Sequence, residues 1–173
     1  MTTWPNKSVS LSAISLVALG IASIASTGCA GKAIETQRPS RVLRATTVQS
    51  SEENASASAA PQSIRSRFQL LLDEALYSES PFQRGNQLTI KWQFVTYREG
   101  SRALRYVVGF GAGQGKVVVK ARFLDERGRE VATIQSEGTI TMGAFGGSYQ
   151  TALSKCADAI AKYTKETFYA SSR

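Results

Sequence analysis

The spacing of apolar residues changes twice after residue 63, and this pattern constrains the fold most. From residue 63 to residue 80 apolar side chains recur every three or four positions, as on one face of a helix. Over 87–97, 116–124 and 130–141 they alternate with polar residues, as in strands buried on one side. The helical spacing returns after residue 148. The sequence therefore predicts a helix, three strands and a second helix.

The apolar faces of these elements form the predicted core. The first helix contributes Ile64, Phe68, Leu71, Leu72, Ala75 and Leu76, and the second contributes Tyr149, Ala152, Leu153, Cys156, Ile160 and Tyr163. The strands contribute Leu88, Ile90, Trp92 and Phe94, then Val117, Val119, Ala121 and Phe123, then Ala132, Ile134 and Ile140. Residues 125–128, Asp-Glu-Arg-Gly, are typical of a hairpin loop. Ser63 and Ser148 are the expected helix N-caps. Antiparallel strands with helices on one face predict an α+β two-layer sandwich.

The composition divides the chain into three parts. Residues 1–28 are apolar, with Lys7 as their only charged side chain. Their uncharged core is about fifteen residues long, which suits a signal peptide and is short of the roughly twenty that a membrane-spanning helix needs. Residues 29–62 are small and polar, and residues 63–173 hold most of the aromatic residues. We expect a signal peptide at 1–28, a flexible tether at 29–62 and a folded head at 63–173.

A cysteine lies at the end of the first part. Residues 26–30 read Ser-Thr-Gly-Cys-Ala and resemble the lipobox of bacterial lipoproteins, in which the cysteine receives a diacylglyceryl group before the signal peptide is removed. Thr27 and Gly28 fit that pattern, whereas Ser26 replaces the usual aliphatic residue. This resemblance implies that Cys29 is lipidated and attaches the protein to a membrane.

The residue after the cysteine bears on location. By resemblance to proteobacterial sorting, Ala30 favours the outer membrane, with the protein facing the periplasm. Two alternatives remain open for the same segment. Ordinary cleavage after Ala25 would release a soluble protein, and an uncleaved segment would remain as a membrane anchor.

The chain lacks the residues that several kinds of catalytic and binding site require. The chain has no histidine and two cysteines. Ser-His-Asp and Cys-His catalysis are therefore excluded, as are metal sites that contain histidine. The glycines at 109, 111, 113 and 115 do not match a phosphate-binding loop, because Phe110 occupies the position of its first glycine and Val117 that of its serine or threonine. We expect no catalytic group, no metal and no cofactor.

The net charge is positive without forming a block. It is +8 for the whole sequence, and removing residues 1–28 would take away Lys7 and leave +7. Anionic lipid headgroups, an anionic envelope polymer and nucleic acid are the possible anionic partners. Basic and acidic residues are interspersed, however, which favours an ordinary soluble surface over a specific anion site. Nucleic acid is not an expected partner, because an exported protein rarely meets it.

The glycine-rich motifs carry a family resemblance. The stretch Gly-Ser-Arg-Ala-Leu-Arg at 100–105, the alternate glycines before Lys116, and Gly-Ala-Phe-Gly-Gly-Ser at 143–148 resemble small bacterial lipoproteins of the DUF4410 family, a domain of unknown function. The resemblance covers residues 65–168. The predicted order of elements is also similar to anticodon-binding-like domains of envelope lipoproteins, such as those of curli secretion and penicillin-binding-protein activation. Those domains bind other proteins, and the similarity is one of fold.

Three functional hypotheses follow. The leading one is a non-enzymatic, lipid-anchored protein that binds another envelope component. The second is a self-associating subunit of an envelope assembly or secretion complex. The third is an envelope hydrolase using carboxylates alone, which would need two of Asp73, Glu74, Glu99, Asp125 and Glu137 close together in a cleft. The candidate partner surface lies beside the glycine-rich motifs and comprises Arg98, Glu99, Arg102, Arg105 and Phe145.

Overall fold

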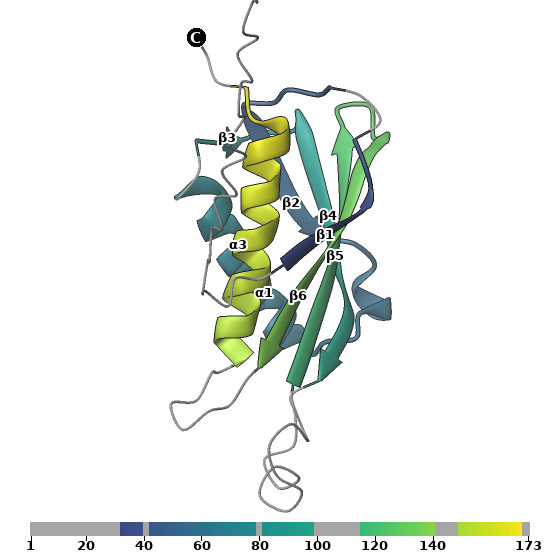
Figure 1. Ribbon diagram of the computed structural model, residues 1–173, viewed down its shortest axis with the longest axis vertical. Helices are drawn as coiled ribbons and strands as arrows, with labels where there is room; N and C mark the ends of the chain where they lie inside the picture. Colours follow the sequence, from purple (N-terminus) through teal and green to yellow (C-terminus); the bar gives the residue numbers. More distant parts are fainter. Residues whose placement is uncertain (1–31, 40–41, 79–80, 99–114, 141–148, 171–173) are drawn as a thin grey trace, which may run out of the picture.

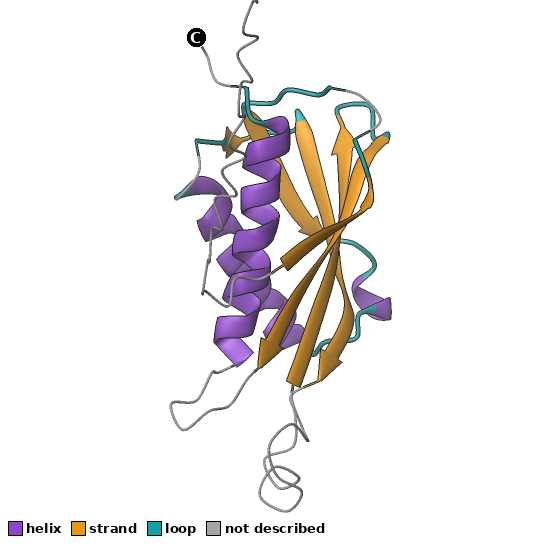
Figure 2. Ribbon diagram, viewed as in Figure 1, coloured by secondary structure: helices purple, strands orange, loops and turns teal. Residues whose placement is uncertain are grey.

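The protein folds into a six-stranded mixed sheet with two long helices packed on one side of it (Figures 1 and 2). The computed structural model describes residues 32–39, 42–78, 81–98, 115–140 and 149–170. The strands are β1 (Lys32–Gln37), β2 (Thr47–Glu52), β3 (Gln83–Arg84), β4 (Leu88–Arg98), β5 (Gly115–Asp125) and β6 (Glu130–Ile140). The helices are the short 3-10 helix η1 (Ala55–Ala57) and the long α1 (Gln62–Tyr77) and α3 (Tyr149–Phe168).

The strands lie side by side in the order β1-β6-β5-β4-β2-β3. The pairs β1–β6, β6–β5 and β5–β4 are antiparallel, whereas β2 runs parallel to both β4 and β3. A parallel pair needs a connection that crosses over the sheet, and α1 supplies it between β2 and β4. The two long helices pack against each other, α3 also covers β5 and β6, and α1 lies beside β2.

Apolar side chains fill the space between the sheet and the helices. Phe68 of α1 is fully buried and meets Trp92 and Phe94 of β4 edge to face, with ring centroids 4.9 and 5.3 Å apart. Phe123 of β5 packs against Phe168 of α3 at 5.2 Å. Aromatic contacts of this kind add to the gain from burying the rings, so these clusters hold both helices on the sheet.

The five elements expected from apolar spacing are present, with small differences. Most of the predicted core residues are buried, but Leu71 and Tyr163 are half-buried and Tyr149 is exposed. Helix α1 begins at Gln62, and the backbone oxygen of Pro61 accepts bonds from its first turn, so Ser63 is not the N-cap. The side chain of Ile140 and all of Ser148 lie outside the described residues.

The predicted helix–three-strand–helix sandwich is wrong, although the α+β class is right. The sheet has six strands, and β1 and β2 come from the segment 29–62 that we expected to be a flexible tether. Neither strand shows a clear apolar alternation, because β1 is mostly exposed and β2 has one fully buried side chain, Val48. Pairing of the backbone with β6 and β4 stabilises these strands, and this pairing leaves no mark on side-chain composition.

Candidate functional site

The outer face is the side of the sheet turned away from α1 and α3, and it carries the main cluster of charged side chains. Among the described elements, the two long helices both lie on the opposite side (Figure 2). Alternation along β4, β5 and β6 sends every second side chain outward, and the strand register places those side chains in rows. The charged residues of the outer face are Lys32, Glu53, Lys91, Arg98, Lys116, Lys120, Arg122, Glu130 and Glu137.

Some of these charges neutralise one another. Arg122 is held between two carboxylates, with its Nε 2.8 Å from Glu130 and its NH1 group bonded to Glu53. The hydrogen bond to Glu130 raises the pKa of Arg122 despite partial burial. Hydrogen bonds from Thr133 and Arg122 lower the pKa of Glu130. Arg122 and Glu130 are therefore both charged near neutral pH, and the trio contains one basic and two acidic groups.

The other basic side chains leave a positive excess. Lys116 pairs with Glu137 at 3.2 Å, and both groups are more than a third exposed. Lys91 donates a hydrogen bond to the hydroxyl of Ser51 at 2.9 Å, which is a neutral partner. Lys120 lies in the middle of the outer face, between Gln93 and Gln135, and makes no ion pair within the described part of the chain. The outer face thus carries six basic and three acidic groups.

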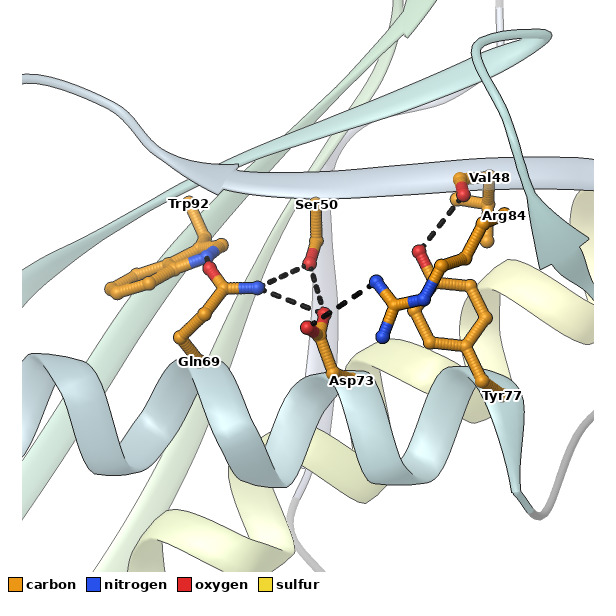
Figure 3. Close-up of polar contacts among 7 residues, drawn as sticks. All are labelled: Val48, Ser50, Gln69, Asp73, Tyr77, Arg84 and Trp92. Carbon is orange, nitrogen blue, oxygen red and sulfur yellow. Dashed lines mark hydrogen bonds and ion pairs between the residues drawn. The ribbon is translucent and has the colours of Figure 1, made fainter.

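A second polar cluster lies between α1 and β2 (Figure 3). Gln69 accepts a hydrogen bond from the indole of Trp92 at 2.9 Å and donates to Ser50 at 2.7 Å. Ser50 in turn donates to Asp73 at 2.8 Å, and Gln69 donates to the same carboxylate at 2.9 Å. One turn later, Tyr77 donates to the backbone oxygen of Val48 at 2.9 Å.

This cluster is suited to fastening α1 to β2. Asp73 also faces Arg84 at 3.7 Å, and the guanidinium of Arg84 stacks over the ring of Tyr77 at 4.2 Å. Burial, followed by the charge of Asp73, raises the pKa of Tyr77, so the phenol remains a donor at neutral pH. Ser50 has no imidazole beside it to act as a base, and its oxygen is already engaged by Gln69. The chemistry of the cluster is hydrogen bonding between helix and strand.

The acidic residues named for a hydrolase lie on three separate elements where the structure describes them. Asp73 lies on α1, Asp125 at the end of β5 and Glu137 on the outer face of β6. The carboxylate of Asp125 forms an ion pair with Arg129 across the hairpin, with 2.7 Å between the two groups. The hydrogen bond from Arg129 lowers the pKa of Asp125. Glu74 is on α1 next to Asp73, and Glu99 lies outside the described residues. No group of three potential metal ligands occurs among the described residues.

The predicted partner surface lies only partly within the described residues. Arg98 is exposed at the end of β4, opposite Lys116, and so belongs to the outer face. Glu99, Arg102, Arg105, Phe145 and the candidate lipidation site Cys29 lie outside the described residues. The outer face itself was missed as a cluster. The sequence indicates part of this cluster, because Lys116, Lys120 and Arg122 alternate with apolar residues along one strand. Lys32 and Lys91 come to the same face only because their strands pair within the sheet.

The other cysteine is a core residue. Cys156 lies on α3 with no exposed surface, and its thiol donates weakly to the backbone oxygen of Ser136 at 3.8 Å. Burial raises the pKa of this thiol to about 11, so it stays protonated and unreactive at neutral pH.

The family of the chain is settled by a match over most of its length. A family model described as "Domain of unknown function (DUF4410)" matches residues 23–144. The chain belongs to the DUF4410 family. The family resemblance seen in the glycine-rich motifs is thereby confirmed, while the similarity to anticodon-binding-like domains stays a prediction.

A solved structure shares the fold at low sequence identity, and a second matches with a lower TM-score. A PelC dodecamer from Paraburkholderia phytofirmans matches with a TM-score of 0.50 and 13% identity, over 82% of this chain and 99% of that chain. A variant PelC dodecamer from the same organism matches with a TM-score of 0.45 and 15% identity, over 76% of this chain and 95% of that chain. No curated protein sequence matched this chain. None of the described helices combines the length and the apolar character needed to span a bilayer.

Proposed function

We propose that this protein is a lipid-anchored component of the bacterial cell envelope whose folded part binds another envelope component without catalysing a reaction. The observation that carries the proposal is the positive excess on the outer face, where neither Lys91 nor Lys120 forms an ion pair with another described residue. An open, charged sheet face offers a broad surface for contact and no enclosed site for a reacting group.

The anchor in this proposal is a lipid on Cys29. Its support is the Ser-Thr-Gly-Cys-Ala sequence at 26–30 after an apolar segment. The family match begins at residue 23 and therefore includes this cysteine. The same motif leads us to propose the outer membrane as the location, with the folded part facing the periplasm.

Metabolic labelling with an alkyne fatty acid in the native host tests the anchor. The wild-type chain should carry the label and sediment with membranes, and Cys29→Ala should lose both. Cys156→Ala is the matched control, because it removes the other cysteine and should retain label and membrane association. A Cys29→Ala chain that still carries the label would contradict the proposal.

A second candidate is a subunit of a larger envelope assembly. The solved protein that shares this fold with a TM-score of 0.50 is itself a dodecamer. In the part of the chain that the structure describes, β1 pairs on one side only, and β2 pairs with β3 only at Thr47 and Val48. Such strand edges can pair with a second copy. Sedimentation of the detergent-extracted native protein should then show a discrete oligomer, whereas a monomer at all concentrations would exclude this candidate.

A further inference from the structure

The start of β1 limits how far the folded part can stand from a lipid on Cys29. Strand β1 begins at Lys32, three residues after that cysteine. An extended chain spans at most about 3.6 Å per residue, so the two Cα atoms lie within about 11 Å of each other. A flexible tether reaching to residue 62 would have let the folded part move freely above the membrane. Because β1 belongs to the sheet, that freedom is absent.

We propose that the outer face lies against anionic lipid headgroups of the membrane in which the protein is anchored. This inference rests on the proposed lipid anchor and names the component that the outer face binds. Lys32, the first described residue after Cys29, lies at the margin of that face, because it is in register with Glu137, whose carboxylate pairs with Lys116 on the outer side. A lipid at this margin brings the outer face to the headgroups.

The distribution of charge favours the same orientation. The outer face has six basic and three acidic groups, whereas α1 and α3 together contain five basic and four acidic residues. Each basic residue held near an anionic leaflet strengthens binding about fivefold, and the attraction extends over about 8 Å at physiological salt. The reach allowed by Cys29 is of that size.

An exposed apolar side chain lies near the start of β1. Ile34 of β1 is in register with Gln135 of the outer face and is 43% exposed. An aliphatic side chain at this position can enter the boundary between headgroups and acyl chains, while the lysines beside it contact phosphate groups. Charge and apolar surface thus occur together on the outer face, at the margin where the lipid would be attached.

Depth-dependent quenching on vesicles tests the orientation. The lipidated full chain would carry a fluorophore on Gln135→Cys, on the outer face, or on Leu70→Cys, an exposed position of α1. Buried Cys156 should not take up the label. Vesicles of phosphatidylcholine with about 30 mol % phosphatidylglycerol would contain a headgroup-attached quencher. We expect quenching at 135 to exceed that at 70 by about threefold or more, and the difference to vanish in about 1 M NaCl.

Charge reversal provides the matched comparison. Lys91→Glu with Lys120→Glu should abolish the difference between the two positions, whereas Lys162→Glu with Lys165→Glu on α3 changes net charge equally and should preserve it. Circular dichroism of both double variants checks that they fold. Equal quenching at 135 and 70 in the wild-type background, or a difference that survives the Lys91 and Lys120 reversal, would overturn the inference.

The same preparation separates this inference from the proposed function. A lipidated protein floats with vesicles of pure phosphatidylcholine even in about 1 M NaCl, because its acyl chains do not depend on charge. If it floats without a preferred orientation, only the inference about the outer face fails. If it does not float at all, the proposed lipid anchor fails.

Discussion

At the scale of single residues, Phe68 has the largest expected effect on stability. Its ring is fully buried and contacts Trp92 and Phe94 at once, so it joins α1 to β4. Phe68→Ala should lower the free energy of unfolding by about 3–5 kcal/mol, through lost burial and the cavity left behind. Urea unfolding followed by circular dichroism measures this change. Leu70→Ala, on the exposed side of the same helix, should change it by less than about 0.5 kcal/mol.

Burial also determines the reactivity of Cys156. Its pKa of about 11 means that the thiol is protonated at pH 8, and it has no exposed surface. In a Cys29→Ala chain, the native protein should therefore react slowly with Ellman's reagent at pH 8 and release one equivalent once unfolded in guanidinium. Leu70→Cys in the same background adds a thiol at an exposed position and should react at once. Rapid reaction of Cys156 in the native chain would contradict its placement in the core.

At the scale of elements, the contact between β6 and α3 depends on Gly138. A Cβ atom at this position would lie 2.6 Å from the backbone oxygen of Ala152 and 3.1 Å from Sγ of Cys156. Since a backbone oxygen cannot move aside cheaply, Gly138→Ala should force α3 away from the sheet and cost about 1–3 kcal/mol of stability. Thermal unfolding of the variant tests this. Thr139→Ala, exposed on the neighbouring position of β6, is the control and should leave the melting temperature nearly unchanged.

The sequence predicts an element well when one of its faces is buried. Helices α1 and α3 and strands β4, β5 and β6 each bury a regular row of apolar side chains, and their positions were correct within about three residues. Strand β1 has no such row, and its half-buried Ala33 sits among exposed residues. It is held by backbone pairing with β6 and by the hydroxyl of Tyr163, which donates to Glu35 at 2.9 Å.

The candidate site, too, could be predicted from the sequence only in part. Alternation alone places Lys116, Lys120 and Arg122 on one side of β5, which the sequence shows directly. Whether a charge there is neutralised depends on strands that are distant in the sequence. Glu53, which follows β2 directly, forms an ion pair with Arg122. Lys32 of β1 lies opposite Glu137 of β6. The excess of positive charge is therefore a property of strand order and register, which apolar spacing does not determine.

At the scale of the whole molecule, the two polar strands β1 and β2 flank the three central strands β6, β5 and β4. Strand β2 pairs with the edge of β4, from Val48 opposite Leu88 to Glu52 opposite Trp92. Strand β1 pairs with the edge of β6. The helix α1 can cross over the sheet only because β2 precedes it as a parallel neighbour of β4. The cooperative folding unit should thus begin near residue 32 instead of residue 63.

Truncation tests this extent of the folding unit. A chain starting at residue 32 retains all six strands and should be soluble and unfold in one transition, whereas a chain starting at residue 60 exposes the edges of β4 and β6. The shorter chain also loses Val48, which is fully buried, and the Ser50 hydroxyl bonded to Asp73. We expect it to aggregate or to unfold at a much lower urea concentration, as judged by size-exclusion chromatography and circular dichroism. If the shorter chain were monomeric and equally stable, β1 and β2 would be accessory to the fold, and the proposed lipid on Cys29 would again be separated from the folded part by a long flexible segment.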